Sequence, residues 1–294
     1  MSTQLTVRHR TVYRYANPVE LGEHRLMCRP RDSHDLRLLE TGLAISPPAQ
    51  VRWIHDVFGN SIAIASFSEP ATELVCDSSF KAEHYPIGAQ DFVLEPYAEI
   101  YPFSYAADEV PDLGRTYERH YPDPEHQVDA WARRFVAELG GGTPATMDVL
   151  LAITRAIRSE FAYGRREEMG TQTPTETLEL GAGSCRDYAL FMMEAVRSLG
   201  FAARFVSGYL YDEALVGATG GLVGGGETHA WVQVYLPGAG WVEFDPTNAL
   251  AGGRNLIRVA VARDASQAVP LSGSFTGNPG DFIGMEVKVE VIAG

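Results

Sequence analysis

A cysteine at residue 185 has the setting of a nucleophile. It follows the small residues Gly181-Ala182-Gly183-Ser184 and begins a stretch with helical spacing that runs to Leu199. The first turn of a helix has free N–H groups and a partial positive charge, which favour a thiolate and can receive the oxyanion formed when that thiolate attacks a carbonyl. A buried, inert thiol is the commoner role of a free cysteine. We expect that role for Cys28 and Cys76, which lie in strand-like segments.

A histidine and an aspartate lie further along, in a predicted hairpin. Two segments in which apolar and polar side chains alternate are joined there by the turn sequence Pro-Gly-Ala-Gly. If Leu236 pairs with Gly240, Asp245 lies opposite Trp231 and diagonal to His229 on one face of the sheet. A carboxylate in that place fixes the tautomer of the imidazole and stabilises the imidazolium. Taken singly, His229 also fits a structural strand end and Asp245 a turn-initiating aspartate.

The remaining titratable residues carry weaker signals. Asp187 falls in the first turn of the cysteine helix, where the helix dipole explains it, and the roles of Glu227 and Glu243 stay open. The three cysteines form no C-x-x-C pair, so we expect neither a metal site nor a disulfide framework, and no cofactor. Seven other histidines are expected to be structural or on the surface: His9, His24, His34, His55, His84, His120 and His126.

These residues require a helix and a sheet to position them. Residues 1–95 consist of short strand-like stretches separated by turns, which predicts a β-sandwich-like domain. Residues 96–123 are rich in proline, tyrosine and acid, and are expected to form a linker or strap. Helical periodicity begins near Pro124, and residues 124–294 are predicted to form the catalytic core, an α+β unit. The glycine-rich stretch 212–228 fits a lid over the site or a surface insertion equally well.

Charge and hydropathy exclude several classes of function. The formal net charge is −14, and this field repels nucleic acid and anionic membrane surfaces. The first ten residues contain no apolar segment typical of a secretory signal, and no apolar run approaches the ~20 residues that span a bilayer. The sparse cysteines indicate a reducing compartment, so a cytoplasmic location is expected.

Together the motifs resemble those of the bacterial transglutaminase-like proteins, which include cysteine proteases. The likeness in the core rests on residues 175–189, 203–209, 228–231 and 241–248, with the order Cys, His, Asp. In the N-terminal part it rests on His9-Arg10-Thr11, Tyr13-Arg14-Tyr15, His24-Arg25-Leu26, Arg29-Pro30-Arg31 and residues 56–60. The resemblance implies a β-sandwich-like domain followed by a transglutaminase-like (papain-like) α+β core, with a helix packed on an antiparallel sheet. It also implies that Cys185 is the nucleophile, His229 the base and Asp245 the orienting acid.

The chemistry expected of such a triad is acyl transfer through a thioester. The thiolate attacks an amide or other acyl carbonyl of a peptide or protein substrate, and the amine leaves with a proton from the histidine. The Cys185 N–H would be one oxyanion donor, and Tyr163 and the Trp231 indole are candidates for the second. Water as acceptor gives a peptidase or amidase, and an amine gives a transglutaminase. The open glycine-rich stretch slightly favours hydrolysis.

Two further classes of function remain. A non-catalytic peptide-binding module would keep the fold and a groove, and labelling with an iodoacetamide probe separates it from an enzyme. Acyl transfer from a thioester donor such as a coenzyme A conjugate uses the same triad. It ranks last because the sequence has no phosphate-cradling loop or basic cluster.

Overall fold

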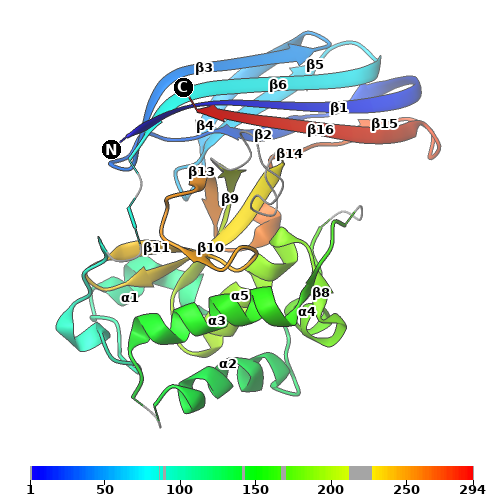
Figure 1. Cartoon of the computed structure of the whole chain (residues 1–294). Coiled ribbons are helices and arrows are strands. Elements are labelled where there is room, and N and C mark those ends of the chain that lie inside the picture. Colours follow the sequence, from blue (N-terminus) through cyan, green and yellow to red (C-terminus); the bar gives the residue numbers. More distant parts are fainter. Residues whose placement is uncertain are drawn as a thin grey trace.

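The structure is a computed structural model that describes residues 2–85, 87–88, 91–140, 143–166, 170–211 and 227–293. Figure 1 shows long strands at the top, a second and shorter sheet in the middle, and helices below it. The predicted α+β fold is confirmed: a β-rich region is followed by a core in which helices cover an antiparallel sheet.

The β-rich region contains two sheets that enclose an apolar core. One sheet has the order β15–β1–β6–β3, with β16 also paired to β1, and the other has the order β14–β2–β5–β4. Side chains alternate in and out along β6, and Leu74 and Cys76 meet Tyr15 and Cys28 between the sheets. The strands are β1 (Thr3–Leu21), β2 (His24–Arg29), β3 (Leu36–Ser46), β4 (Ala49–His55), β5 (Ser61–Phe67), β6 (Ala71–His84), β14 (Leu271–Ser272), β15 (Phe275–Thr276) and β16 (Phe282–Ala293).

The C-terminal tail belongs to these sheets and not to the core. We predicted that residues 124–294 form the core, but β14 pairs with β2, and both β15 and β16 pair with β1. The pairing of β16 with β1 runs from Leu5 opposite Ala293 to Arg14 opposite Gly284, and after a bulge Tyr15 lies opposite Phe282. Alternating side chains identify a strand but not its partner, so the sequence pattern could not assign the tail to a sheet.

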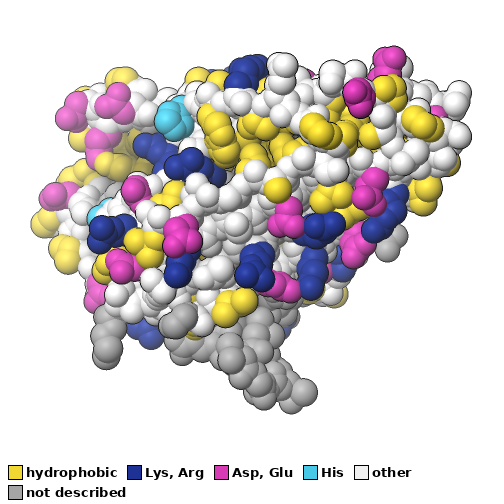
Figure 2. All heavy atoms as spheres, turned by 90° about the horizontal axis from the view of Figure 1, so that it is seen from above, with side chains coloured by type: hydrophobic (Ala, Val, Ile, Leu, Met, Phe, Trp, Pro, Cys, Tyr) yellow, Lys and Arg dark blue, Asp and Glu magenta, His cyan; other side chains and the backbone are white. Residues whose placement is uncertain are grey.

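The outer face of this region mixes charges and apolar side chains. Figure 2 shows the view from above, in which acidic, basic and hydrophobic side chains are interspersed. Arg10 pairs with Asp77 at 3.0 Å and Arg14 with Glu286 at 3.2 Å, while Phe282 is 47% exposed. Among the residues with a described position, no helix is long and apolar enough to cross a membrane.

The core sheet lies between helices and the β-rich region. Its strand order is β12–β11–β10–β9–β13. One face packs on the helices through Val232, Val234 and Phe244, and the other meets the β-rich region through Tyr209 and Ile257. The strands of this sheet are β9 (Ala203–Leu210), β10 (Thr228–Leu236), β11 (Gly240–Asp245), β12 (Leu250–Ala251) and β13 (Leu256–Ala262). Two short strands, β7 (Ala162–Tyr163) and β8 (Ala182–Gly183), form a separate parallel pair. The helices are α2 (Gln127–Glu138), α3 (Thr146–Glu160), α4 (Pro174–Leu180) and α5 (Cys185–Ser198).

Hydrogen bonds and ion pairs connect the core to the β-rich region and to residues 96–123. Asn60, in the turn between β4 and β5, accepts a hydrogen bond from the Val261 N–H at 2.9 Å and donates one to the Val261 carbonyl at 2.7 Å. Residues 96–123 run along the core and contain η2 (Pro96–Ala98), α1 (Glu109–Leu113) and η3 (Gly114–Tyr117). Glu194 of α5 holds this segment by accepting from Arg119 at 3.1 Å, and also pairs with Arg197 at 2.8 Å.

Candidate active site

Cys185 is the first residue of α5, as predicted. The preceding Ser184 has an extended backbone, and the Asp187 carboxylate accepts hydrogen bonds from its N–H at 2.8 Å and its hydroxyl at 2.7 Å. Cys185 is 9% exposed, so its thiol lies just below the surface at the positive end of the helix. Gly183 is required here, because a Cβ atom would come within 2.9 Å of the Asp187 Cβ.

Asp187 does more than cap the helix. Its other carboxylate oxygen accepts from Arg166 Nη1 at 2.8 Å and from the Gln172 N–H at 2.7 Å, and its side chain is fully buried. The carboxylate therefore joins the loop before α4 to the turn before Cys185. The sequence signal for the local bonds was present, since an acid three residues after a serine forms a capping box. The distant bonds had no signal in the sequence.

The hairpin register agrees with the prediction. Leu236 pairs with Gly240, and the ladder ends with Val232 opposite Phe244, the residue before Asp245. His229 Nε2 lies 2.9 Å from Asp245 Oδ2, and both side chains are completely buried. The alternation of side chains along the two strands and the tight turn between them thus bring together His229 and Asp245, which lie 16 positions apart in the sequence.

Electrostatics at this pair favour an imidazolium beside a carboxylate. Burial disfavours the charged ring, but the charge of Asp245 and the hydrogen bond to it, helped by the Cys185 side chain, raise the pKa of His229 to about 10. Burial also opposes ionisation of Asp245, yet the His229 charge, with hydrogen bonds from Asn248 and the Thr247 N–H, holds the pKa of Asp245 below its ordinary value. These hydrogen bonds therefore stabilise the negative charge of the buried Asp245 carboxylate.

The sulfur of Cys185 is a neighbour of the same imidazole. The Cys185 side chain contributes to the raised pKa of His229 by hydrogen bonding and by charge. With Nε2 bound to Asp245, the other ring nitrogen is Nδ1, which is buried and makes no well-formed hydrogen bond to the described part of the chain. A looser approach of this kind is usual in unliganded sites, where the bonds tighten with substrate.

The two candidate oxyanion donors have different neighbours. Tyr163 of β7 lies beside Gly183 of β8, and burial, reinforced by the adjoining Cys185 side chain, raises the pKa of Tyr163. Trp231 is fully buried and stacks on His229, with ring centroids 6.1 Å apart and planes at 27°. Its indole N–H has no hydrogen-bond partner among the placed residues. The structure thus brings Tyr163 to the sulfur and Trp231 to the imidazole.

Two acids near the site, whose roles the sequence left open, form polar contacts. Glu227 forms an ion pair with Arg165 at 2.8 Å, and Glu243 bonds to Gln233 and Arg258. The predicted lid at 212–228 falls, except for its last two residues, outside the described residues.

Comparison with known proteins agrees with this architecture. Residues 5–83 match the bacterial transglutaminase-like N-terminal region, and residues 133–246 match the transglutaminase-like superfamily. An uncharacterized protein of Mycobacterium tuberculosis is 27% identical over 97% of this chain and 91% of its own length. A protein-glutamine gamma-glutamyltransferase of Pseudomonas aeruginosa is 37% identical over 70 residues, which are 24% of this chain and 10% of that protein.

A solved structure shares the whole fold. It is that of a proposed cysteine protease from Cytophaga hutchinsonii, which aligns with a TM-score of 0.72 at 20% identity, over 100% of this chain and 91% of its own. At that identity the likeness concerns the fold. The chain therefore joins a bacterial transglutaminase-like N-terminal region to a core that belongs to the transglutaminase-like superfamily, as the sequence motifs predict.

Proposed function

We propose that the chain is a thiol enzyme that hydrolyses peptide or amide bonds through Cys185, His229 and Asp245. The observation that carries the proposal is the buried 2.9 Å contact between His229 Nε2 and Asp245 Oδ2, on a ring whose pKa is also raised by the Cys185 side chain. Membership of the core in the transglutaminase-like superfamily supports a thiol enzyme in general.

Each group has one task in this mechanism. The Cys185 thiolate attacks the carbonyl carbon, and the carbonyl π electrons move to the oxygen, which the N–H of Cys185 stabilises. The C–N bond then breaks, the amine leaves with the proton from His229, and a thioester remains on Cys185. Water, deprotonated by His229, cleaves the thioester to a carboxylic acid and restores the thiolate–imidazolium pair. Asp245 keeps the ring in one orientation throughout.

Tyr163 is our choice for the second oxyanion donor. Its hydroxyl neighbours the sulfur, and its raised pKa keeps it a hydrogen-bond donor through the neutral range. Trp231 instead covers one face of the imidazole. Tyr163→Phe should lower kcat with little change in KM, because an oxyanion bond exists only in the transition state.

Acyl transfer to an amine is the second candidate. It is favoured by the complete burial of the His229 and Asp245 side chains, since a site that excludes water protects a thioester from hydrolysis. A cytoplasmic location and a peptide or protein substrate complete the proposal.

One assay tests both candidates. The protein is incubated with a peptide-amide library, with and without a primary amine, and the products are identified by mass spectrometry. Free acids in both reactions support hydrolysis, and amine-conjugated peptides support transamidation. In parallel, iodoacetamide should alkylate Cys185 much faster than Cys28 and Cys76 at neutral pH, because burial raises the pKa of both of those thiols. Equal rates for the three thiols would contradict an enzymatic role for Cys185.

A further inference from the structure

A cavity of about 260 Å³ lies on the face of the core sheet that meets the β-rich region. Charged, aromatic and apolar side chains from both parts line it, among them His84, Ile87, Phe92, Arg204, Trp241 and Arg258. None of its lining residues belongs to the candidate triad. Arg204 pairs across the sheet with Gln233, four residues beyond His229 on β10, so the cavity is a separate site.

Arg204 is the unusual residue of this cavity. Its Nε donates to Gln233 Oε1 at 2.7 Å, and its guanidinium lies over the Trp241 ring at 4.1 Å. No carboxylate lies within ion-pair distance of it in the part of the chain that the structure describes, and its two terminal nitrogens have no hydrogen-bond acceptor there. Burial, reinforced by Arg258 and partly offset by Glu243, lowers the pKa of Arg204 to about 9.

The neighbouring Arg258, in contrast, has carboxylate acceptors for its guanidinium within the same cavity. Arg258 donates to Glu243 at 2.7 Å and to both oxygens of Asp35 at 3.2 and 3.3 Å. The two carboxylates are therefore engaged with Arg258, and Arg204 is left with a neutral amide. Arg204 is partly buried and faces the cavity with no anion paired to it among the described residues, and a bidentate carboxylate is the natural complement of such a guanidinium.

We propose that this cavity binds a small organic carboxylate with an apolar body. The carboxylate accepts from both terminal nitrogens of Arg204, and the apolar part contacts Ile87 and Phe92. The volume suits a ligand below drug size. A monoanion is favoured over a phosphate because Asp35 and Glu243 also line the cavity and repel a doubly charged ligand more strongly than a singly charged one.

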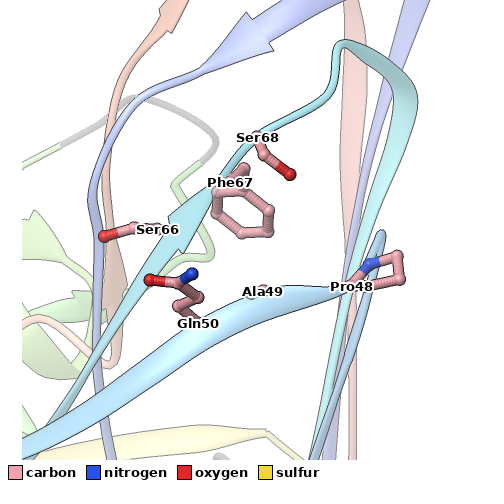
Figure 3. A pocket seen from close by; sticks show the side chains of 6 residues that line it. All are labelled: Pro48, Ala49, Gln50, Ser66, Phe67 and Ser68. Atoms are coloured by element: carbon pink, nitrogen blue, oxygen red, sulfur yellow. The ribbon is translucent and has the colours of Figure 1, made fainter.

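A hollow in the β-rich region lacks such a group. It has a volume of about 330 Å³ and is formed by residues at the ends of β4 and β5 (Figure 3). Every side chain that lines it is uncharged: Pro48, Ala49, Gln50, Ser66, Phe67 and Ser68. No charged side chain there would hold a carboxylate, so this hollow is not expected to bind the acid.

Calorimetric titration of the full chain tests the proposal. The probes are 3-phenylpropionate and hexanoate, each compared with its neutral amide. Saturable binding of at least one acid, with its amide at least about 10-fold weaker, is expected, because charged hydrogen bonds exceed neutral ones by that order. Acids and amides that bind equally, or no saturation by either acid below about 10 mM, would overturn it.

Variants locate the binding. Arg204→Met keeps the methylene stem over Trp241 and should weaken acid binding about 10- to 100-fold, and Arg204→Lys should weaken it less. Arg134→Met is the matched control, since Arg134 also lies over a tryptophan, Trp131, at 5.0 Å but is paired with Glu160. Thermal melts report whether each variant is folded. Wild-type affinity in Arg204→Met, or an equal loss in Arg134→Met, would refute the assignment, and the acid–amide comparison on the unmodified chain stands without any variant.

Discussion

Strands β10 and β11 carry two buried polar clusters on one face, and the clusters differ in how far their members are satisfied. At one end His229 and Asp245 meet at 2.9 Å, and one ring nitrogen faces no ordinary partner. At the other end Gln233 and Glu243 pair directly across the ladder at 2.6 Å, and Arg258 completes the bonds of Glu243. The same two strands thus support the cluster proposed to be catalytic and a second cluster that connects the sheet to the β-rich region through Asp35. Both clusters are buried, so burial alone does not distinguish the candidate catalytic pair from the structural one, and the difference between them is the Nδ1 of His229, which is unpaired among the described residues.

The largest effect should come from the reactive cluster. Asp245→Asn leaves the shape of the site but removes the charge that supports the imidazolium, so we expect kcat/KM for a cleaved peptide amide to fall by about 10²- to 10⁴-fold. The pKa of His229 should fall as well, and the pH profile of Cys185 alkylation would move with it. Gln233→Met, in the other cluster, should leave that profile in place. An unchanged profile in Asp245→Asn would contradict the orienting role.

A change in the cluster of Gln233, Glu243 and Arg258 should lower the stability of the protein and leave the reactivity of Cys185 unchanged. Arg258→Met leaves Glu243 and Asp35 without their cation, and removing one partner of a largely buried pair costs about 3 kcal/mol in the free energy of unfolding. Urea denaturation measures this loss, with Arg10→Met on the exposed face as control. The alkylation rate of Cys185 per folded molecule should stay at the wild-type level. A loss below about 1 kcal/mol would show that the cluster does not fasten the two parts.

The pH dependence of stability should carry the signature of His229. Its pKa is about 10 when folded against 6.5 in the unfolded chain, so its contribution is fully present below pH 6.5 and is lost as the pH rises towards 10. In that window the free energy of unfolding should fall by about 1 kcal/mol per pH unit more steeply than in His229→Asn. Urea unfolding at several pH values measures the slope. Parallel slopes in the two proteins would mean that the ring is not held as an imidazolium.

The smallest effect is expected outside both clusters. Arg14 pairs with Glu286 and Glu73 on the outer sheet, but its side chain is 50% exposed. Exposed pairs contribute about 0–1 kcal/mol, so Arg14→Ala should change the free energy of unfolding by less than 1 kcal/mol, and even less at high salt. A loss as large as that of Arg258→Met would contradict the expectation that exposed ion pairs stabilise the fold less than buried ones.

Local patterns predicted the parts of the site that depend on neighbours in sequence. The glycine-rich turn before Cys185 indicated the helix start, and alternation around a tight turn gave the pairing of Leu236 with Gly240. The capping box of α4, Thr173 with Glu176, was equally readable, but no helix was predicted there. A capping box can therefore mark a helix that is too short to show hydrophobic periodicity.

Contacts between distant segments could not be predicted in this way. Alternation in residues 285–291 showed a strand, but its pairing with β1 depends on the packing of the whole β-rich region. The bonds of Asp187 to Arg166 and of Arg258 to Asp35 join residues 21 and 223 positions apart. Likewise, the sequence shows that Arg204 is charged but not that it lacks a counter-ion.

The pairing of β1 with β16 means that the outer sheet is completed only late in synthesis of the chain. Residues 3–21 leave the ribosome before residues 282–293, and one side of that strand lacks most of its hydrogen-bonding partners until those later residues have been made. The core sheet and its helices, encoded in between, can assemble while the outer sheet is still incomplete. A nascent chain arrested before residue 282 should therefore expose the flank of its first strand, and that species should be the one most in need of a chaperone.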